Sequence, residues 1–158
     1  MFFDLKSEML TRRFLLGAMV ASFITPAVKA QEMPVYFATD GAAMAGYDVV
    51  SYFDGESPVR GQPEYSVVWK GAEWHFASAE NRDAFERDPR SFAPQFGGYC
   101  AYAMAQGVLI STDPLAWQVV DGRLYLTHSL EIEEMWREAS AEYIRMAEAH
   151  WPVILYEQ

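Results

Sequence analysis

The chain has 158 residues, of which 51% are hydrophobic and 22% are charged, a balance typical of a globular protein. Acidic residues outnumber basic ones by 22 to 12, which gives a formal net charge of −10 at pH 7. This charge argues against nucleic acid and anionic membrane surfaces as partners. Cys100 is the single cysteine, so no disulfide can form within the chain.

Residues 1–30 have the pattern of a cleaved export signal. The pair Arg12 and Arg13 directly precedes a short apolar run, and small residues precede a cleavage site at Gln31. A transmembrane helix needs about 20 apolar residues, so this run predicts no stable membrane insertion after cleavage. The arginine pair favours the twin-arginine export machinery as partner, with an ordinary secretory signal as the alternative. We therefore expect a periplasmic protein of the bacterial cell envelope.

Residues 31–158 have the length of a single domain. Residues 1–30 contain four basic and two acidic side chains, a net of +2, so the remaining part has a net charge of −12. Its first part, residues 31–45, shows no clear periodicity. Residues 46–53 form a compact apolar unit, and the glycines and prolines of residues 54–63 indicate a loop.

A hairpin and a short helix are expected next. Tyr65, Val67 and Trp69 alternate with Ser66, Val68 and Lys70, which predicts a strand, and residues 73–77 read as the return strand after a turn at Gly71. Ser78 is a suitable N-cap for a helix over residues 79–87, which a following Asp-Pro pair ends.

The second half predicts one more hairpin and a long helix. Asp121-Gly122 between residues 117–120 and 123–127 is the strongest hairpin signal in the sequence. Ser129 is expected to cap a long helix whose apolar residues recur at spacings of three and four as far as Trp151-Pro152. The fold class is α+β, a single small domain with short antiparallel hairpins, short helices and a long C-terminal helix.

Cys100 is the first candidate functional residue. Gly97 and Gly98 break the chain, and residues 99–106 have helical composition with Gly107 as a C-terminal cap. Cys100 is thus expected in the first helical turn, where free N–H groups and the helix dipole favour a thiolate. The alternative is that its side chain is a small buried hydrophobe.

Three histidines are possible partners for the cysteine. His75 alternates with aromatic residues on a strand, which is more typical of a hydrogen-bonded structural group than of a ligand. His128 follows a predicted strand, where it is either near the working edge of the domain or a surface residue. His150 lies near the end of the last helix, where a cation suits the dipole, and we interpret it as structural.

A short motif resembles the Tyr-His-Ser (YHS) domain family. Its residues are Trp74, His75, Phe76, Ser78, Phe85, Asp88, Pro89 and Phe92, followed by the glycine pair Gly97 and Gly98. With the flanking sequence, the resemblance covers nearly all of residues 42–152. It points to the exported, single-domain members, a subgroup that includes selenoproteins, and it implies a reactive chalcogen at Cys100.

The sequence departs from this family at two positions. The metal-binding members place cysteines one and five residues after the Phe of the strand, where this chain has Ala77 and Asn81. The usual Cys-x-x-x-Cys metal site therefore cannot form.

Three functions remain open. The first is a module that binds a soft metal ion, copper or zinc, through Cys100 and a histidine, His75 or His128. The second is a thiol-redox protein in which Cys100 is the catalytic residue. The third is a structural envelope protein without chemistry. No phosphate loop, Cys-x-x-Cys or Ser-His-Asp order supports another enzyme class, so an enzyme is not favoured.

Overall fold

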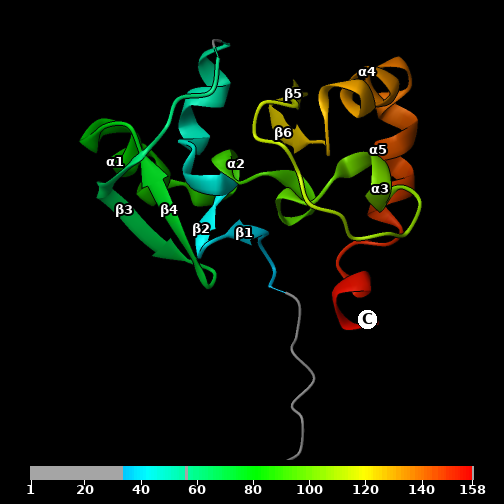
Figure 1. Cartoon of the computed structure of the whole chain (residues 1–158), viewed down its shortest axis with the longest axis horizontal. Helices are drawn as coiled ribbons and strands as arrows, with labels where there is room; N and C mark the ends of the chain where they lie inside the picture. The colour runs from blue at the N-terminus through cyan, green and yellow to red at the C-terminus, as the bar shows by residue number, and fades with distance from the viewer. Residues whose placement is uncertain (1–33, 56, 158) are drawn as a thin grey trace, which may run out of the picture. The chain divides into compact units, whose positions relative to one another are not determined.

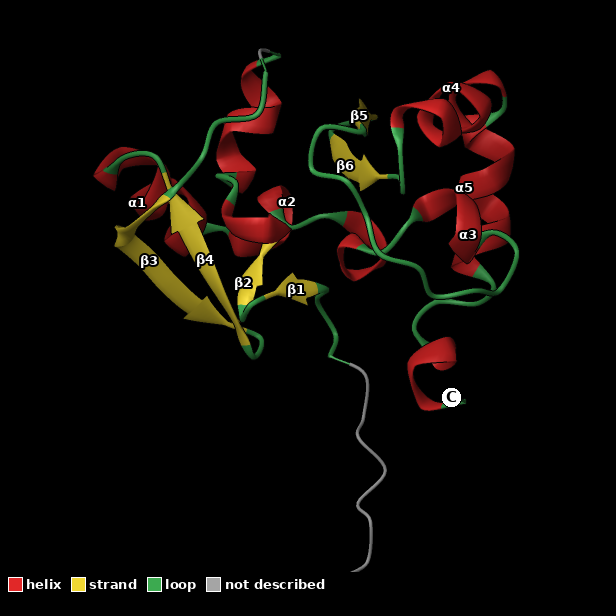
Figure 2. Cartoon of the chain, in the orientation of Figure 1, coloured by secondary structure: helices red, strands yellow, loops and turns green. Residues whose placement is uncertain are grey.

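The computed structural model describes residues 34–55 and 57–157, and the predicted export signal lies outside them. Within these residues the chain has the expected α+β fold (Figures 1 and 2). The strands are β1 (Ala38–Thr39), β2 (Ala42–Ala43), β3 (Gln62–Trp69), β4 (Ala72–Phe76), β5 (Trp117–Val120) and β6 (Arg123–Leu126). The α-helices are α1 (Ala79–Arg87), α2 (Pro89–Phe92), α3 (Ala101–Met104), α4 (Leu130–Glu138) and α5 (Ser140–Glu148). Short 3₁₀ helices are η1 (Met44–Gly46), η2 (Val49–Asp54), η3 (Gln95–Gly98) and η4 (Val153–Tyr156).

Four strands form a mixed sheet in the order β1-β2-β4-β3. The predicted hairpin is confirmed, because β3 and β4 pair antiparallel on either side of Lys70 and Gly71. Both turn residues have positive φ, 52° and 81°, which matches the right-handed twist of the strands. The segment that showed no periodicity supplies β1 and β2, and β2 pairs parallel with β4. Two-residue strands are too short to produce an alternating pattern.

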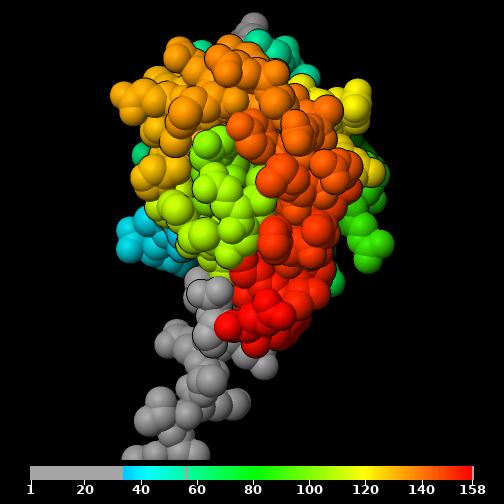
Figure 3. Space-filling view, turned by 90° about the vertical axis from the view of Figure 1, so that its right-hand side faces the viewer, coloured from blue at the N-terminus to red at the C-terminus, as the bar shows by residue number. Residues whose placement is uncertain are grey.

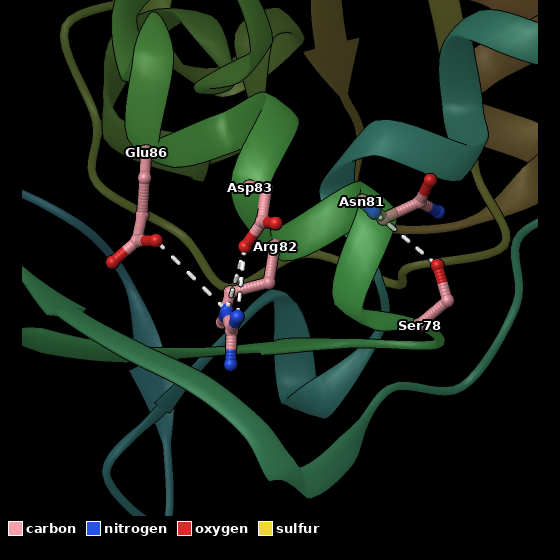
Figure 4. Close-up of polar contacts among 5 residues, drawn as sticks. All are labelled: Ser78, Asn81, Arg82, Asp83 and Glu86. Carbon is pink, nitrogen blue, oxygen red and sulfur yellow. Dashed lines mark hydrogen bonds and ion pairs between the residues drawn. The ribbon is translucent and has the colours of Figure 1, made fainter.

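Helix α1 begins and ends where its sequence predicts. The Ser78 hydroxyl accepts a hydrogen bond of 3.2 Å from the Asn81 amide (Figure 4). In the same helix Arg82 pairs with Asp83 at 2.8 Å and lies 3.9 Å from Glu86. The Ser78 cap satisfies a free amide at the N-terminus of the helix, and the proline after Asp88 ends the helix.

The second predicted hairpin is also confirmed. β5 and β6 pair antiparallel, and the turn residues Asp121 and Gly122 have φ values of 50° and 72°. Successive side chains of β6 point to opposite faces of the strand and lie in two different cores. Leu124 and Leu126 belong to the core of the mixed sheet, whereas Tyr125 packs with α3, α4 and α5 in a second core.

The prediction of one long C-terminal helix is wrong. The backbone leaves the helical region at Ala139, with φ −144° and ψ 41°, so α4 and α5 are separate helices that run in different directions (Figure 1). The predicted cap at its start is present, since the Ser129 hydroxyl accepts from the Ile132 amide at 3.3 Å. Breaking the helix lets both Trp136 and Ala147, which are fully buried, pack into the second core. No helix in the described part of the chain is long and apolar enough to cross a membrane.

The helix expected over residues 99–106 is also shorter than predicted. It covers one turn, Ala101–Met104, because the amides of Gln106 and Val108 both return to the Ala103 carbonyl and close it. Gly107 has φ 72°, as a C-terminal cap requires. Cys100 is therefore the residue before the helix and not part of its first turn.

Candidate functional site

Cys100 and His128 line the same small pocket, which we call the thiol pocket. It has a volume of about 220 Å³. Its other lining residues are Tyr102, Ala103, Gln106, Val108, Ile110 and Ile132. These residues come from α3, the segment after it and the start of α4, and Figure 3 shows the α3 region at the surface between α4 and α5. Because the walls are mostly apolar, the dielectric constant inside the pocket is low, and a pair of soft ligands inside it is little solvated.

Cys100 is a buried residue of the pocket lining. The residue is only 1% exposed, its amide donates to the Ile110 carbonyl at 3.1 Å, and its carbonyl accepts from Met104 at 2.9 Å. The backbone of Cys100 is thus fixed by the segment that returns after α3. A one-turn helix sums few peptide dipoles, so the expected stabilisation of a thiolate by a helix N-terminus has little support in the structure.

His128 is exposed at the rim, and its ring is oriented by Ser111. Its Nδ1 lies 3.0 Å from the Ser111 carbonyl oxygen and 3.4 Å from the Ser111 hydroxyl. A carbonyl oxygen only accepts, so Nδ1 carries the proton and donates it. The lone pair of the neutral ring is then on Nε2. Metal-binding histidines commonly have this arrangement, with one ring nitrogen bonded to a carbonyl and the other free for a ligand.

His75 lies elsewhere in the fold. Its Nε2 is 3.0 Å from a carboxylate oxygen of Glu73, two residues earlier on the same face of β4. In Figure 1, β4 and α3 lie at opposite sides of the view, so the structure does not bring His75 to Cys100. Among the described residues no group of three or more His, Cys, Asp or Glu side chains is arranged to hold a metal ion.

A buried carboxylate, Asp48, accepts hydrogen bonds from Ala77 and Asn81, the two positions at which the resemblance led us to look for metal-binding cysteines. Asp48 is 0% exposed, and its Oδ2 accepts hydrogen bonds from the Ala77 amide at 2.8 Å and from Asn81 Nδ2 at 2.7 Å. Its Oδ1 accepts from the Val50 amide at 2.9 Å, which also caps η2. This network joins η2, the end of β4 and α1. Positions 77 and 81 are thus committed to a structural hydrogen-bond network and do not fit a metal ion.

Sequence reasoning missed the role of Asp48. The available signal was a single acidic residue inside an otherwise apolar unit, directly before the start of a helical turn at Val49. An acidic residue in such a place is either an N-cap or a buried acceptor, and Asp48 is both.

The aromatic residues of the YHS motif form the core beside this network. Trp74, Phe76 and Phe85 are at most 1% exposed, and the Phe85 ring lies 5.1 Å from each of the other two rings. The Trp74 indole donates to the Trp69 carbonyl at 3.0 Å, so its one polar atom is satisfied. Their role in this fold is packing.

Comparison with protein families identifies part of the chain. The model of the YHS domain matches residues 50–96, which run from η2 to the start of η3 and include the motif residues from Trp74 to Pro89. No curated protein and no solved structure matches the chain significantly. The thiol pocket lies entirely after the matched residues. Residues 50–96 of this chain are therefore a YHS domain.

Proposed function

We propose that this chain is an exported YHS-domain protein that binds one soft metal ion, copper(I), through the Cys100 thiolate and His128 Nε2. The observation that carries the proposal is that these two side chains line one small, mostly apolar pocket. The hydrogen bond from His128 Nδ1 to Ser111 leaves the second ring nitrogen free for a ligand. Binding, and not catalysis, is the activity that such a pair supports.

The number and type of donors select among metals. Thiolate and imidazole are ligands that copper(I) and zinc both accept. Zinc, however, is held by four protein ligands in structural sites and by three in catalytic ones. Copper(I) accepts two ligands, a soft sulfur and a nitrogen, which is the set that this pocket offers. We therefore narrow the expectation of copper or zinc to copper(I), with His128 and not His75 as the nitrogen ligand.

Burial of the sulfur does not favour the thiol-redox alternative. A cysteine that is recycled by an external thiol must be reached by that thiol. Cys100 is 1% exposed, so only a small species can approach its sulfur through the thiol pocket.

The proposal includes export to the periplasm after removal of residues 1–30. An acidic domain with one cysteine cannot lose its thiol to an internal disulfide in that oxidising compartment. N-terminal sequencing of the exported protein is expected to begin at Gln31. Replacing Arg12 and Arg13 by lysine is expected to block export, whereas continued export would indicate the general secretory route.

The metal proposal is tested by titrating copper(I) into purified protein under anaerobic, reducing conditions with a competing chelator. The wild type is expected to bind one equivalent, Cys100→Ser none, and His128→Gln at least about tenfold more weakly. His75→Gln is the matched control, because it removes the same ring from the mixed sheet, and it is expected to bind as the wild type does. Equal affinity in the wild type and Cys100→Ser would refute the proposal. If His75→Gln lowers the affinity for copper(I) and His128→Gln does not, His128 is not the nitrogen ligand.

A further inference from the structure

A second and larger cavity lies on the side of the fold where the N-terminal segment meets the C-terminal one. Its volume is about 420 Å³, within the range of about 300–1,000 Å³ that small-molecule sites occupy. The lining residues that matter for its chemistry are Tyr36, Trp69, Lys70, Arg90, Phe96 and Trp151. We call it the cationic cavity, and we infer that it binds a small aromatic carboxylate.

The shape of the cationic cavity depends on a close backbone contact. Gly97, with φ 62°, has no Cβ, and a Cβ there would lie 1.9 Å from the Val35 carbonyl oxygen. The segment before β1 therefore lies directly against η3, where the Phe37 amide donates to the Gly97 carbonyl at 2.8 Å. This contact brings Tyr36 and Val35 into one wall of the cavity.

The apolar walls are aromatic. The rings of Tyr36 and Trp69 have centroids 5.1 Å apart, and those of Phe96 and Trp151 have centroids 6.4 Å apart. Flat aromatic ligands pack well against such rings in stacked or edge-on arrangements. The wall composition therefore favours a planar apolar body over a flexible polar one.

The charged residues of the lining are both cations. Lys70 and Arg90 line the cavity, and none of its described lining residues is an aspartate or glutamate. Neither cation takes part in an ion pair within residues 34–55 and 57–157. Lys70 is also the one lysine between residues 31 and 158, a part of the chain with a net charge of −12. Two cations without carboxylate partners in so acidic a domain indicate an anionic ligand.

Arg90 and Tyr36 both line the cavity. Burial raises the pKa of the Tyr36 hydroxyl, and the positive charge of Arg90 opposes this effect. A carboxylate between Lys70 and Arg90 would receive charge-assisted hydrogen bonds while its ring lies on the aromatic walls. Both cations are exposed, so each contributes modestly and the affinity will fall with added salt.

Isothermal titration calorimetry with 2-naphthoate and its neutral amide, 2-naphthamide, tests this inference on the purified chain. The two probes have the same rings and nearly the same size. We expect 2-naphthoate to bind at one site, at least about tenfold more tightly than the amide. Lys70→Gln and Arg90→Gln are each expected to lower the affinity for 2-naphthoate about threefold and to leave the affinity for the amide unchanged.

Arg87→Gln is the matched control. Arg87 is exposed on α1 and does not line the cavity, so its replacement changes the net charge equally without touching the site. It is expected to bind 2-naphthoate as the wild type does. Equal binding of acid and amide, an equal effect of Arg87→Gln and Arg90→Gln, or no binding at millimolar 2-naphthoate would each overturn the inference.

Discussion

Asp48 offers the sharpest test of how this fold is held together. Its buried carboxylate accepts three hydrogen bonds, from Val50, Ala77 and Asn81, and these donors belong to three different segments. Asp48→Asn keeps the size of the side chain but replaces one acceptor oxygen by an NH₂ donor. At least one buried N–H group then faces another donor and loses its partner.

The expected loss follows from the bonds that the carboxylate makes. A hydrogen bond to a charged group contributes about 1.5–3 kcal/mol, and leaving a buried donor unsatisfied costs about 1–3 kcal/mol. Removing a buried charge relieves part of its desolvation cost, which offsets some of the loss. We therefore expect Asp48→Asn to lower the free energy of unfolding by about 3 kcal/mol, a large share of the about 5–15 kcal/mol of a typical domain.

Urea unfolding followed by tryptophan fluorescence measures this change, with the midpoint shifted and the slope unchanged. Asp54→Asn is the control, since Asp54 is an exposed carboxylate at the end of the same 3₁₀ helix, and its replacement should change stability by less than about 0.5 kcal/mol. If Asp48→Asn is within about 1 kcal/mol of the wild type, the hydrogen-bond network does not stabilise the fold as argued.

Three further predictions concern a cap, a close contact and pH. Ser78→Ala removes the hydrogen bond to the Asn81 amide and should cost about 1 kcal/mol in urea unfolding. Gly97→Ala should lower the free energy of unfolding by about 3 kcal/mol or more, because its Cβ would lie 1.9 Å from the Val35 carbonyl oxygen. At Gly71 a Cβ would meet nothing within 4 Å, so Gly71→Ala should cost only about 1–2 kcal/mol, the cost of an alanine in the left-handed region. Burial raises the pKa of the Tyr99 hydroxyl, so the folded state keeps a proton that the unfolded chain releases. The contribution of Tyr99 to the free energy of unfolding should be complete below about pH 10 and should fall as the pH rises above it. A constant urea midpoint between about pH 8 and 10.5 would contradict this prediction.

Local sequence signals predicted the parts of the fold that local physics decides. The two hairpins follow from alternation and from turn residues that accept positive φ, and α1 follows from Ser78 and the Asp-Pro pair. Each of these signals acts between residues close in the chain. The elements they predict are the ones that the structure confirms.

Non-local packing decided what the sequence could not predict. The apolar stripe of the last helix continues through Ala139, yet the chain breaks there because Trp136 and Ala147 pack into one core from two directions. Asp48 accepts hydrogen bonds from Ala77, 29 residues later in the chain, and from Asn81, 33 residues later. That Cys100 and His128 line the same pocket likewise depends on how the segment after α3 returns, which no pattern in the sequence encodes.

The position of the thiol pocket changes what the family match can say about function. The matched part, residues 50–96, contains the motif residues, but Trp74, Phe76 and Phe85 are buried in a core. The Ala77 amide and the Asn81 side chain donate to Asp48. A site with free donors must therefore be sought outside it. The later residues supply β6, whose Tyr125 faces a second core, and on that core α3 and the segment after it form the pocket that holds Cys100. The copper(I) site that we propose therefore lies in the residues that follow the matched part.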